Sequence, residues 1–378
     1  MTGDLHCHTT LSDGSLGIEE VIVQAKRMGL DFLAITDHDT LSSSNRAQIL
    51  GERYGVKVIP AVELSAWDKK RNSKVHILCY APQKPDRLEG LCLKSCQIRK
   101  DCAKEMIEKV MARYPIPADA VLHYTKSSKS IFKQHIMRAL VNYGYATELY
   151  GSVNDKLFAY PNGECLVTRE YPDVNFVLDL IHSAKGIAVM AHPVMFNNTE
   201  LLLELIEAGK LDGIEAYHYS ATPTQQQKLV DIAKEHDLIV TGGSDFHGLY
   251  NETMTHIGSM TTDKENLDKL FKLIHMLYGL MGLQFSDEAA LFPRRKELMK
   301  HGSFSGRAKP RLYRNEQSPF AKRRADAKGQ GLAFANAVLA GELGLHPCGA
   351  VPHQPREDRC DTRGCPGAGT CRIYRALP

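Results

Sequence analysis

The sequence predicts an α/β fold built on a parallel sheet that is either open or closed into a barrel. Short apolar stretches alternate with segments of helical periodicity over residues 18–80 and again over residues 174–278, as in strand–helix–strand units. Polar residues follow these strands, at the edge of a parallel sheet where successive loops converge. The chain has 378 residues, of which 43% are hydrophobic, enough for a packed core.

The expected elements follow in chain order. In the first half, the strands are Phe32–Thr36, Lys57–Leu64 and Val75–Tyr80, and the helices are Ile18–Met28 and Ser44–Tyr54. In the second half, the strands are Ile187–Met190, Gly213–Ala216 and Leu238–Thr241, and the helices are Val174–Ala184, Thr199–Ala208, Thr224–His236 and Glu265–Tyr278. Between residues 84 and 165 the alternation stops, and "LKSCQIRKDCAKEMIEKVMARY" and "IFKQHIMRALVNYG" have helical spacing. We therefore expect a helical insertion that caps one face.

The composition predicts a cytoplasmic protein with no membrane partner. No apolar run reaches the roughly 18 residues of a membrane span, and the N-terminus lacks the basic and apolar segments of a secretory signal. Without a signal, free thiols are the better interpretation of the six cysteines in periodic sequence. These are Cys7, Cys79, Cys92, Cys96, Cys102 and Cys165.

Residues 295–378 have a different character and form a basic tail rich in Cys, Pro and Gly. The net charge of +3 arises there, because residues 301–378 carry 13 Lys and Arg against 6 Asp and Glu. Apart from one helical pattern at Leu332–Leu343, the tail has too little apolar periodicity to pack. We expect it to be disordered, or to be fused to the chain by a reading-frame error.

Histidines and carboxylates recur at the ends of the expected strands. His6 and His8 stand two apart, so on a strand both imidazoles point the same way and can hold one ion. Each motif alone is an ordinary polar turn, but all of them in this order predict a metal centre. The candidates are His6, His8 and Asp13 in "DLHCHTTLSDG", His38 in "ITDHDT", Glu63 in "AVELS", His76 in "KVHIL", His192 in "MAHP", and Asp245 and His247 in "GGSDFHG".

Six histidines and three carboxylates suit Mn²⁺, Zn²⁺ or Fe²⁺. Nine ligands exceed what one ion needs, so the sequence predicts two or three divalent ions, with a carboxylate such as Glu63 bridging two of them. The glycines of "GGSDFHG" are expected to let the backbone approach the site closely, at the end of the last barrel strand.

In this order the motifs resemble the polymerase and histidinol phosphatase (PHP) superfamily of metal-dependent phosphoesterases, over about residues 3–283. The resemblance implies a distorted seven-stranded (β/α)7 TIM-like barrel with metals at its rim, so we expect residues 1–283 to form one PHP phosphoesterase domain. The resemblance also implies how the ligands are divided among three ions. His6 and His8 would hold the first ion with Glu63 and Asp245. Glu63 would bridge to a second ion held by His76 and His192, and the third would lie among Asp13, His38 and His247.

The implied reaction is hydrolysis of a phosphate ester by a hydroxide that bridges two ions, because a bound metal lowers the pKa of water toward about 7. Glu63, Asp245 and His247 are the expected catalytic residues, and the general acid is not identified. The resemblance is closest to stand-alone members that act on small phosphorylated substrates. Some hydrolyse nucleoside 3′,5′-bisphosphates, and others hydrolyse both ester bonds of 5-phosphoribosyl 1,2-cyclic phosphate.

Substrate contacts are expected from the insertion, at Arg99, Lys133, His135 and Arg138. Arg99 matches an arginine that the bisphosphatase-like members carry. In "SIFKQHIMRAL", the family usually has Thr-Arg-x-His, so His135 is retained and Lys133 replaces an arginine. A lysine can neutralise a phosphate, but as a point charge without the bidentate fork.

Other functions stay open. Related alternatives are a 5′–3′ exoribonuclease on short RNA and a histidinol-phosphate phosphatase. A dinuclear amidohydrolase commonly needs a bridging lysine where this chain has Glu63, and no polymerase follows to make the domain an accessory module. The non-enzymatic alternative is an RNA-binding protein that uses "RAKPRLYR" and "AKRR" of the tail. The sequence leaves the native metal and the oligomeric state undecided.

Overall fold

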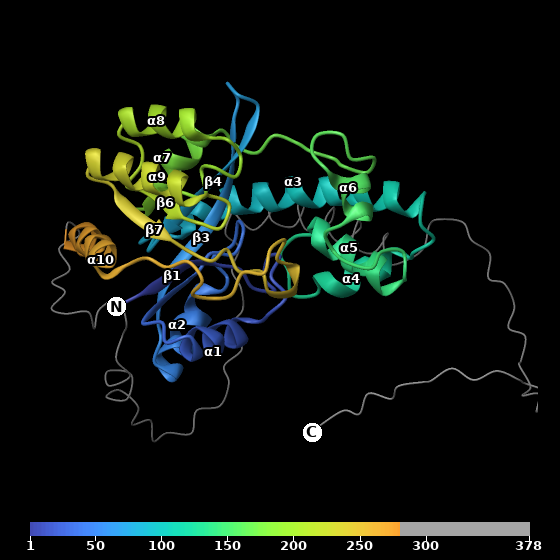
Figure 1. The fold of residues 1–378 in the computed structure, drawn as a ribbon, viewed down its shortest axis with the longest axis horizontal. Coiled ribbons are helices and arrows are strands. Elements are labelled where there is room, and N and C mark those ends of the chain that lie inside the picture. The colour runs from blue at the N-terminus through green and yellow to red at the C-terminus, as the bar shows by residue number, and fades with distance from the viewer. Residues whose placement is uncertain (280–378) are drawn as a thin grey trace, which may run out of the picture. The chain divides into compact units, whose positions relative to one another are not determined.

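The protein is built around seven strands, shown in a computed structural model that describes residues 1–279 (Figure 1). The strands pair in chain order, each with the next one along the chain. They are β1 (Gly3–Cys7), β2 (Phe32–Ile35), β3 (Lys57–Asp68), β4 (Ser73–Tyr80), β5 (Ile187–Met190), β6 (Gly213–Tyr217) and β7 (Ile239–Gly242). The predicted α/β class is therefore confirmed. The six expected strands all occur, and β1 is a further strand that the pattern of alternation did not include.

Contacts between the first strand and the segment after β7 bring the two edges of the sheet together. Cys7 forms a parallel bridge with Phe246, and the backbone N–H of His8 donates to the Phe246 carbonyl at 2.9 Å. The buried Asp4 carboxylate accepts from the backbone N–H of Ser244 at 2.9 Å and of Gly258 at 2.8 Å. The seven strands thus form a nearly closed barrel, as the sequence predicts.

The sheet is not wholly parallel, which corrects one expectation. β4 is antiparallel to both β3 and β5, whereas the other neighbouring pairs are parallel. Only residues 69–72 separate β3 from β4, too few for the crossover that a parallel pair needs. β3 runs to Asp68, beyond the expected end at Leu64, and joins β4 in a hairpin. This antiparallel hairpin is the place where the barrel departs from a regular parallel (β/α) barrel.

Six helices accompany the barrel strands, namely α1 (Ile18–Arg27), α2 (Ser44–Tyr54), α7 (Val174–Ser183), α8 (Thr199–Glu207), α9 (Pro223–Glu235) and α10 (Lys264–Gly279). The sequences of these helices account for where they begin and for which of their faces is buried. α1 buries Ile18, Val21, Ile22 and Ala25, which share one face at helical spacing. α9 starts with Pro223 directly after a Thr222 cap, a combination that favours a helix start.

Residues 84–165 carry helices, as expected of the cap. They are α3 (Asp86–Met111), α4 (Ala118–Leu122), the short 3-10 helix η1 (His123–Thr125), α5 (Lys133–Asn142) and α6 (Ser152–Phe158). Figure 1 shows α3 running from the barrel toward α4, α5 and α6. Apolar residues of these helices, including Val110, Ile136, Leu140 and Leu157, form a core of their own. The cap therefore has an apolar cluster of its own beside the barrel.

Two further expectations concern thiols and membranes. The six cysteines of the described residues are all free and buried, as predicted. None of the helices within residues 1–279 is both long and apolar enough to cross a membrane. The domain limits at 283 and 295 stay predictions, and the tail with its Leu332–Leu343 helix lies outside the described residues.

Candidate metal centre

All nine candidate ligands gather at one rim of the barrel, where six of the seven strands deliver them. His6 lies in β1 and His8 directly after it, and their Nε2 atoms are 3.1 Å apart. Asp13 and His38 lie in the loops after β1 and β2, and His192 follows β5. Asp245 and His247 follow β7. Glu63 and His76 come from the hairpin, in β3 and β4. The structure thus brings together residues that are up to 241 positions apart in the sequence.

His76 reaches this rim by a different route from the one expected. The sequence pattern placed it at the carboxyl end of a parallel strand, which is wrong. His76 lies near the start of β4 and pairs with Ser65 of β3. Because β4 runs antiparallel, its first residues meet the carboxyl ends of the parallel strands.

The first group of ligand atoms surrounds one oxygen of Asp245. Asp245 Oδ1 lies 3.3 Å from His6 Nε2 and 3.1 Å from His8 Nε2. Glu63 Oε2 lies 3.4 and 3.3 Å from the same two nitrogens. Two histidines and two carboxylates converging in this way could hold one divalent ion.

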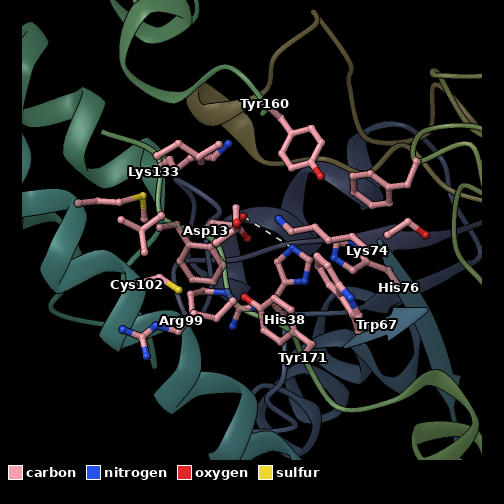
Figure 2. Close-up of a pocket in the computed structure, with 18 of the residues that line it drawn as sticks. Asp13, His38, Trp67, Lys74, His76, Arg99, Cys102, Lys133, Tyr160 and Tyr171 are labelled. Carbon is pink, nitrogen blue, oxygen red and sulfur yellow. Dashed lines mark ion pairs between the residues drawn. The ribbon is translucent and has the colours of Figure 1, made fainter. Parts of the chain in front are cut away.

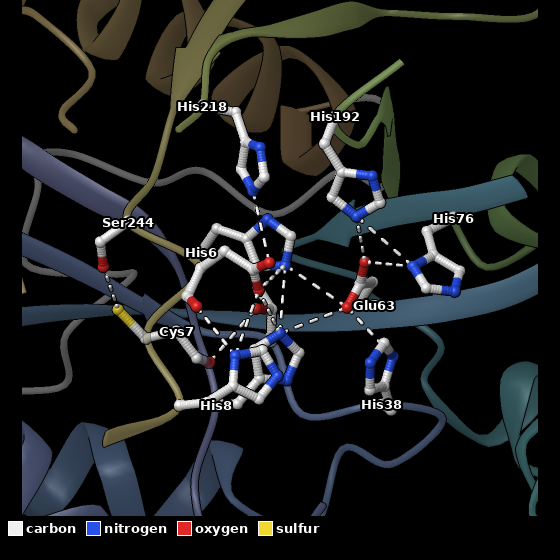
Figure 3. Close-up of polar contacts among 12 residues, drawn as sticks. His6, Cys7, His8, His38, Glu63, His76, His192, His218 and Ser244 are labelled. Carbon is white, nitrogen blue, oxygen red and sulfur yellow. Dashed lines mark hydrogen bonds and ion pairs between the residues drawn. The ribbon is translucent and has the colours of Figure 1, made fainter. Parts of the chain in front are cut away.

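Glu63 faces a second group with its other oxygen (Figure 3). Glu63 Oε1 lies 2.8 Å from His76 Nδ1 and 3.0 Å from His192 Nε2. These two histidine nitrogens are 3.4 Å apart. Because its oxygens face different groups, Glu63 has the geometry of a bridging carboxylate.

The third group centres on Asp13. Its Oδ1 lies 3.3 Å from His247 Nε2, and its Oδ2 lies 3.8 Å from His38 Nε2. His38 also turns its Nδ1 toward Glu63 Oε2, at 3.0 Å. His38 can therefore serve either the third group or the Glu63 group, as its two ring nitrogens face both.

The cluster is buried, and two of its carboxylate oxygens lack a hydrogen bond of suitable geometry. Among the described residues, Asp13 Oδ1 and Glu63 Oε2 are buried oxygens that accept no hydrogen bond. Burial raises the pKa of the Glu63 carboxyl, but His38 and His76 outweigh it and hold that pKa well below its usual range. Burial also raises the pKa of Asp245, and His6 and His247 outweigh it in the same way. Ionised buried carboxylates among imidazoles are a donor set that fits divalent metal ions.

The loop after β7 passes very close to β1, and its glycines permit this. A Cβ on Gly243 would lie 2.3 Å from His6 Cβ and 2.5 Å from the His6 backbone nitrogen. Asp245 itself has a positive φ of 49°, a strained conformation for a residue with a side chain. The expectation that glycine allows a close backbone approach here is confirmed.

We expect Gly243→Ala to destabilise the protein by about 1–3 kcal/mol, because its new methyl group has no space beside the His6 backbone. The same substitution should lower metal content, since it displaces His6. Denaturant unfolding and elemental analysis measure the two effects. Gly90→Ala in α3 is the matched control, as nothing lies within 4 Å of its added Cβ. Equal stability of the two variants would contradict the prediction.

Sequence reasoning missed two residues that support the ligands. Glu215 in β6 lies 2.9 Å from His6 Nδ1 with one oxygen, and its other oxygen accepts from the His192 backbone N–H at 2.8 Å. His218 Nε2, after the same strand, lies 3.3 Å from Asp245 Oδ2. Partners of this kind orient metal ligands. The signal was present, because a glutamate within an apolar strand and a histidine at its end are both unusual.

The four expected substrate contacts lie in different surroundings. A cavity of about 630 Å³ adjoins the metal centre, and both Arg99 and Lys133 line it (Figure 2). Arg99 is already paired with Asp39, at 2.7 Å. His135 and Arg138 do not line this cavity or the neighbouring one of about 370 Å³.

His135 has a local structural role. It is 2% exposed, and its Nδ1 accepts from the Phe132 backbone N–H at 3.2 Å, which caps the start of α5. Burial lowers the pKa of His135 to about 4, so the ring is neutral. Arg138 packs over the Tyr124 ring, 6.0 Å from its centre.

Lys74 of β4, which no sequence motif singled out, is a further cation that lines both cavities. Burial lowers the pKa of Lys74 to about 8, with a further contribution from the charges of Lys133 and Arg99. Lys74 lies in the hairpin two residues before His76, and this position could not be deduced from the sequence without knowing how β3 and β4 pair.

Known proteins resemble this chain in sequence and in fold. The profile of the PHP domain family matches residues 4–306. A phosphoribosyl 1,2-cyclic phosphate 1,2-diphosphodiesterase from Eggerthella lenta is 34% identical over 68% of this chain and 98% of that relative. A 5′-3′ exoribonuclease from Haemophilus influenzae is 31% identical over 65% of this chain and 89% of that relative. Among solved structures, a chain from Bifidobacterium adolescentis, described as a candidate metal-dependent phosphoesterase, is 29% identical with a TM-score of 0.65, over 72% of this chain and 96% of that one.

The fold and the clustered side chains define a metal-dependent phosphoesterase, a hydrolase of phosphoric esters. The chain belongs to the PHP domain family. The resemblance seen in the motifs is thereby confirmed, whereas the role of each ligand and the number and identity of the ions stay predictions.

Proposed function

We propose that the protein hydrolyses phosphate esters of a small phosphorylated ribose or nucleotide, and that 5-phosphoribosyl 1,2-cyclic phosphate is its best substrate. The observation that carries this proposal is the arrangement of the nine-residue cluster beside a cavity lined by lysines. The Eggerthella lenta relative, similar along nearly its whole length, supports the choice of substrate.

The residues at the rim fit this chemistry. His6, His8, Asp13, His38, Glu63, His76, His192, Asp245 and His247 would hold two or three divalent ions such as Mn²⁺, Zn²⁺ or Fe²⁺. When bound, the ions supply Lewis acidity and activate water. Glu63, Asp245 and His247 would be the catalytic residues, and Glu63 and Asp245 are ionised at neutral pH because neighbouring histidines keep the pKa of each carboxyl low.

Tyrosines complete the metal side of the cavity. Tyr150 and Tyr219 line the smaller cavity together with Asp245. Burial raises the pKa of both hydroxyls above the usual value. Both hydroxyls therefore stay protonated at neutral pH. The Tyr150 hydroxyl donates to the Tyr250 carbonyl at 2.8 Å, whereas the Tyr219 hydroxyl can donate to a phosphoryl oxygen or to a leaving alcohol.

The test is a side-by-side assay of hydrolysis by the full chain loaded with Mn²⁺, in which phosphate release is measured on the two small substrates and nucleotide release is measured on RNA. We expect the highest kcat/KM on 5-phosphoribosyl 1,2-cyclic phosphate, lower values on adenosine 3′,5′-bisphosphate and on short 5′-phosphorylated RNA, and loss of all turnover with a chelator. Preference for RNA would favour the exoribonuclease alternative. Absence of turnover on every substrate, in protein that contains metal, would overturn the proposal.

A further inference from the structure

The β3–β4 hairpin continues beyond the metal ligands and carries one more pair of side chains on the same face. The register pairs Ser65 with His76, and then Trp67 with Lys74. Residues directly opposite each other in an antiparallel pair share a face, and so do residues two apart along a strand. Trp67 and Lys74 therefore follow Glu63 and His76 on that face. Both line the cavity of about 630 Å³.

Several hydrogen-bond donors in this cavity have no acceptor. Within the described residues, Trp67 Nε1 and Arg99 Nη1 are buried without a hydrogen-bond partner, and these residues are 5% and 9% exposed. Indole, guanidinium and ammonium groups are donors only. A ligand that satisfies them must offer acceptor oxygens.

The cavity also has an excess of positive charge. Lys74, Lys133, Arg99 and Arg169 line it, and Asp13, at the metal side, is its one carboxylate within the described part of the chain. Arg99 and Arg169 are each paired with an acid. Neither lysine has a carboxylate of residues 1–279 within ion-pair distance. Figure 2 shows both lysine side chains reaching into the pocket, which Tyr160 also lines.

We propose that Trp67 and Lys74 form a subsite for a second phosphate group of the substrate, and that Lys74 selects molecules phosphorylated at two positions. The inference rests on the proposed function and names the residue that sets its specificity. Lys74 and His76 are two residues apart on a strand, which separates their backbones by roughly 7 Å. A phosphorylated sugar can span this spacing, with one phosphate at the metal centre and the other at Lys74.

The first experiment compares two substrates that differ in one phosphate, 5-phosphoribosyl 1,2-cyclic phosphate and ribose 1,2-cyclic phosphate. We expect Lys74→Met to reduce the ratio of their kcat/KM values about 10- to 100-fold, because a charge-assisted contact is lost. The loss should fall mainly on the KM of the doubly phosphorylated substrate. Lys74→Arg should restore part of the ratio, and Trp67→Phe should lower it less than Lys74→Met does.

Lys69→Met is the matched control, because Lys69 is an exposed lysine of the same hairpin that does not line the cavity. It should keep the ratio of the unaltered protein. Thermal unfolding of each variant establishes that it is folded. If Lys74→Met and Lys69→Met show the same ratio while the enzyme is active, the subsite assignment is wrong and the proposed function stands.

A binding measurement distinguishes a wrong subsite assignment from a wrong proposed function. Calorimetric titration of the full chain with ribose 5-phosphate should show binding that Lys74→Met weakens and Lys69→Met leaves unchanged. Binding that depends on Lys74 in a protein that hydrolyses none of the substrates would support the subsite and overturn the proposed function. Binding that is equal in both variants would overturn the subsite.

Discussion

Asp245→Asn should reduce metal-dependent phosphate release at least about 100-fold, more than loss of a supporting partner typically does. Asp245 Oδ1 lies within 3.3 Å of the Nε2 atoms of both His6 and His8. Asparagine keeps the shape but removes a negative charge and places a neutral amide among the ligand nitrogens. Glu63→Gln should reduce phosphate release by at least the same factor, because the two oxygens of Glu63 face two groups of histidines.

The measurements are kcat/KM for phosphate release with added Mn²⁺ and metal content by elemental analysis. Asp231→Asn is the control, an exposed aspartate on α9 away from the rim. It should match the unaltered protein in both measurements. Full activity of Asp245→Asn at unchanged metal content would exclude Asp245 from the metal centre.

Arg99→Met should lower the free energy of unfolding by about 3–5 kcal/mol, the usual effect of leaving one partner of a buried ion pair without the other. Arg99 Nη2 donates to Asp39 Oδ2 at 2.7 Å, and the Asp39 carboxylate is fully buried. The same nitrogen lies 2.7 Å from Ser65 Oγ. Arg99 thereby fastens α3 of the cap to the β2–α2 loop and to β3.

Denaturant unfolding of a double-mutant cycle measures this effect. Asp39→Asn combined with Arg99→Met removes both charges, so we expect the double variant to be more stable than Arg99→Met alone. If Arg99→Met unfolds at the same denaturant concentration as the unaltered protein, the pair contributes nothing measurable.

The cap shows why the residues that line the cavities were harder to predict than the residues that gather at the rim. The helical pattern located α3 and α5, but which side chains face the cavity depends on how these helices pack. His135 turns inward and caps its own helix, and Arg138 packs on Tyr124. Lys133, at the first turn of α5, lines both cavities. Local periodicity identifies a buried face, but it does not distinguish a cavity from a core.

The sequence pattern by itself determined the α/β class, the helical cap and the nine candidate residues that gather at the rim, whereas the closed barrel was what the family resemblance implied. The pattern could do so because strand periodicity is local, and because histidines and carboxylates such as His6, His8 and Asp245 directly end strands whose carboxyl ends converge in any parallel barrel. The tertiary structure alone decided the direction of β4, since strand pairing is set by contacts between residues distant in sequence. That direction brings His76 to the rim and places Lys74 two residues from it on the same face of the hairpin. Contacts between distant segments also let Glu215 of β6, and His218 directly after it, support ligands that come from β1, β5 and the segment after β7.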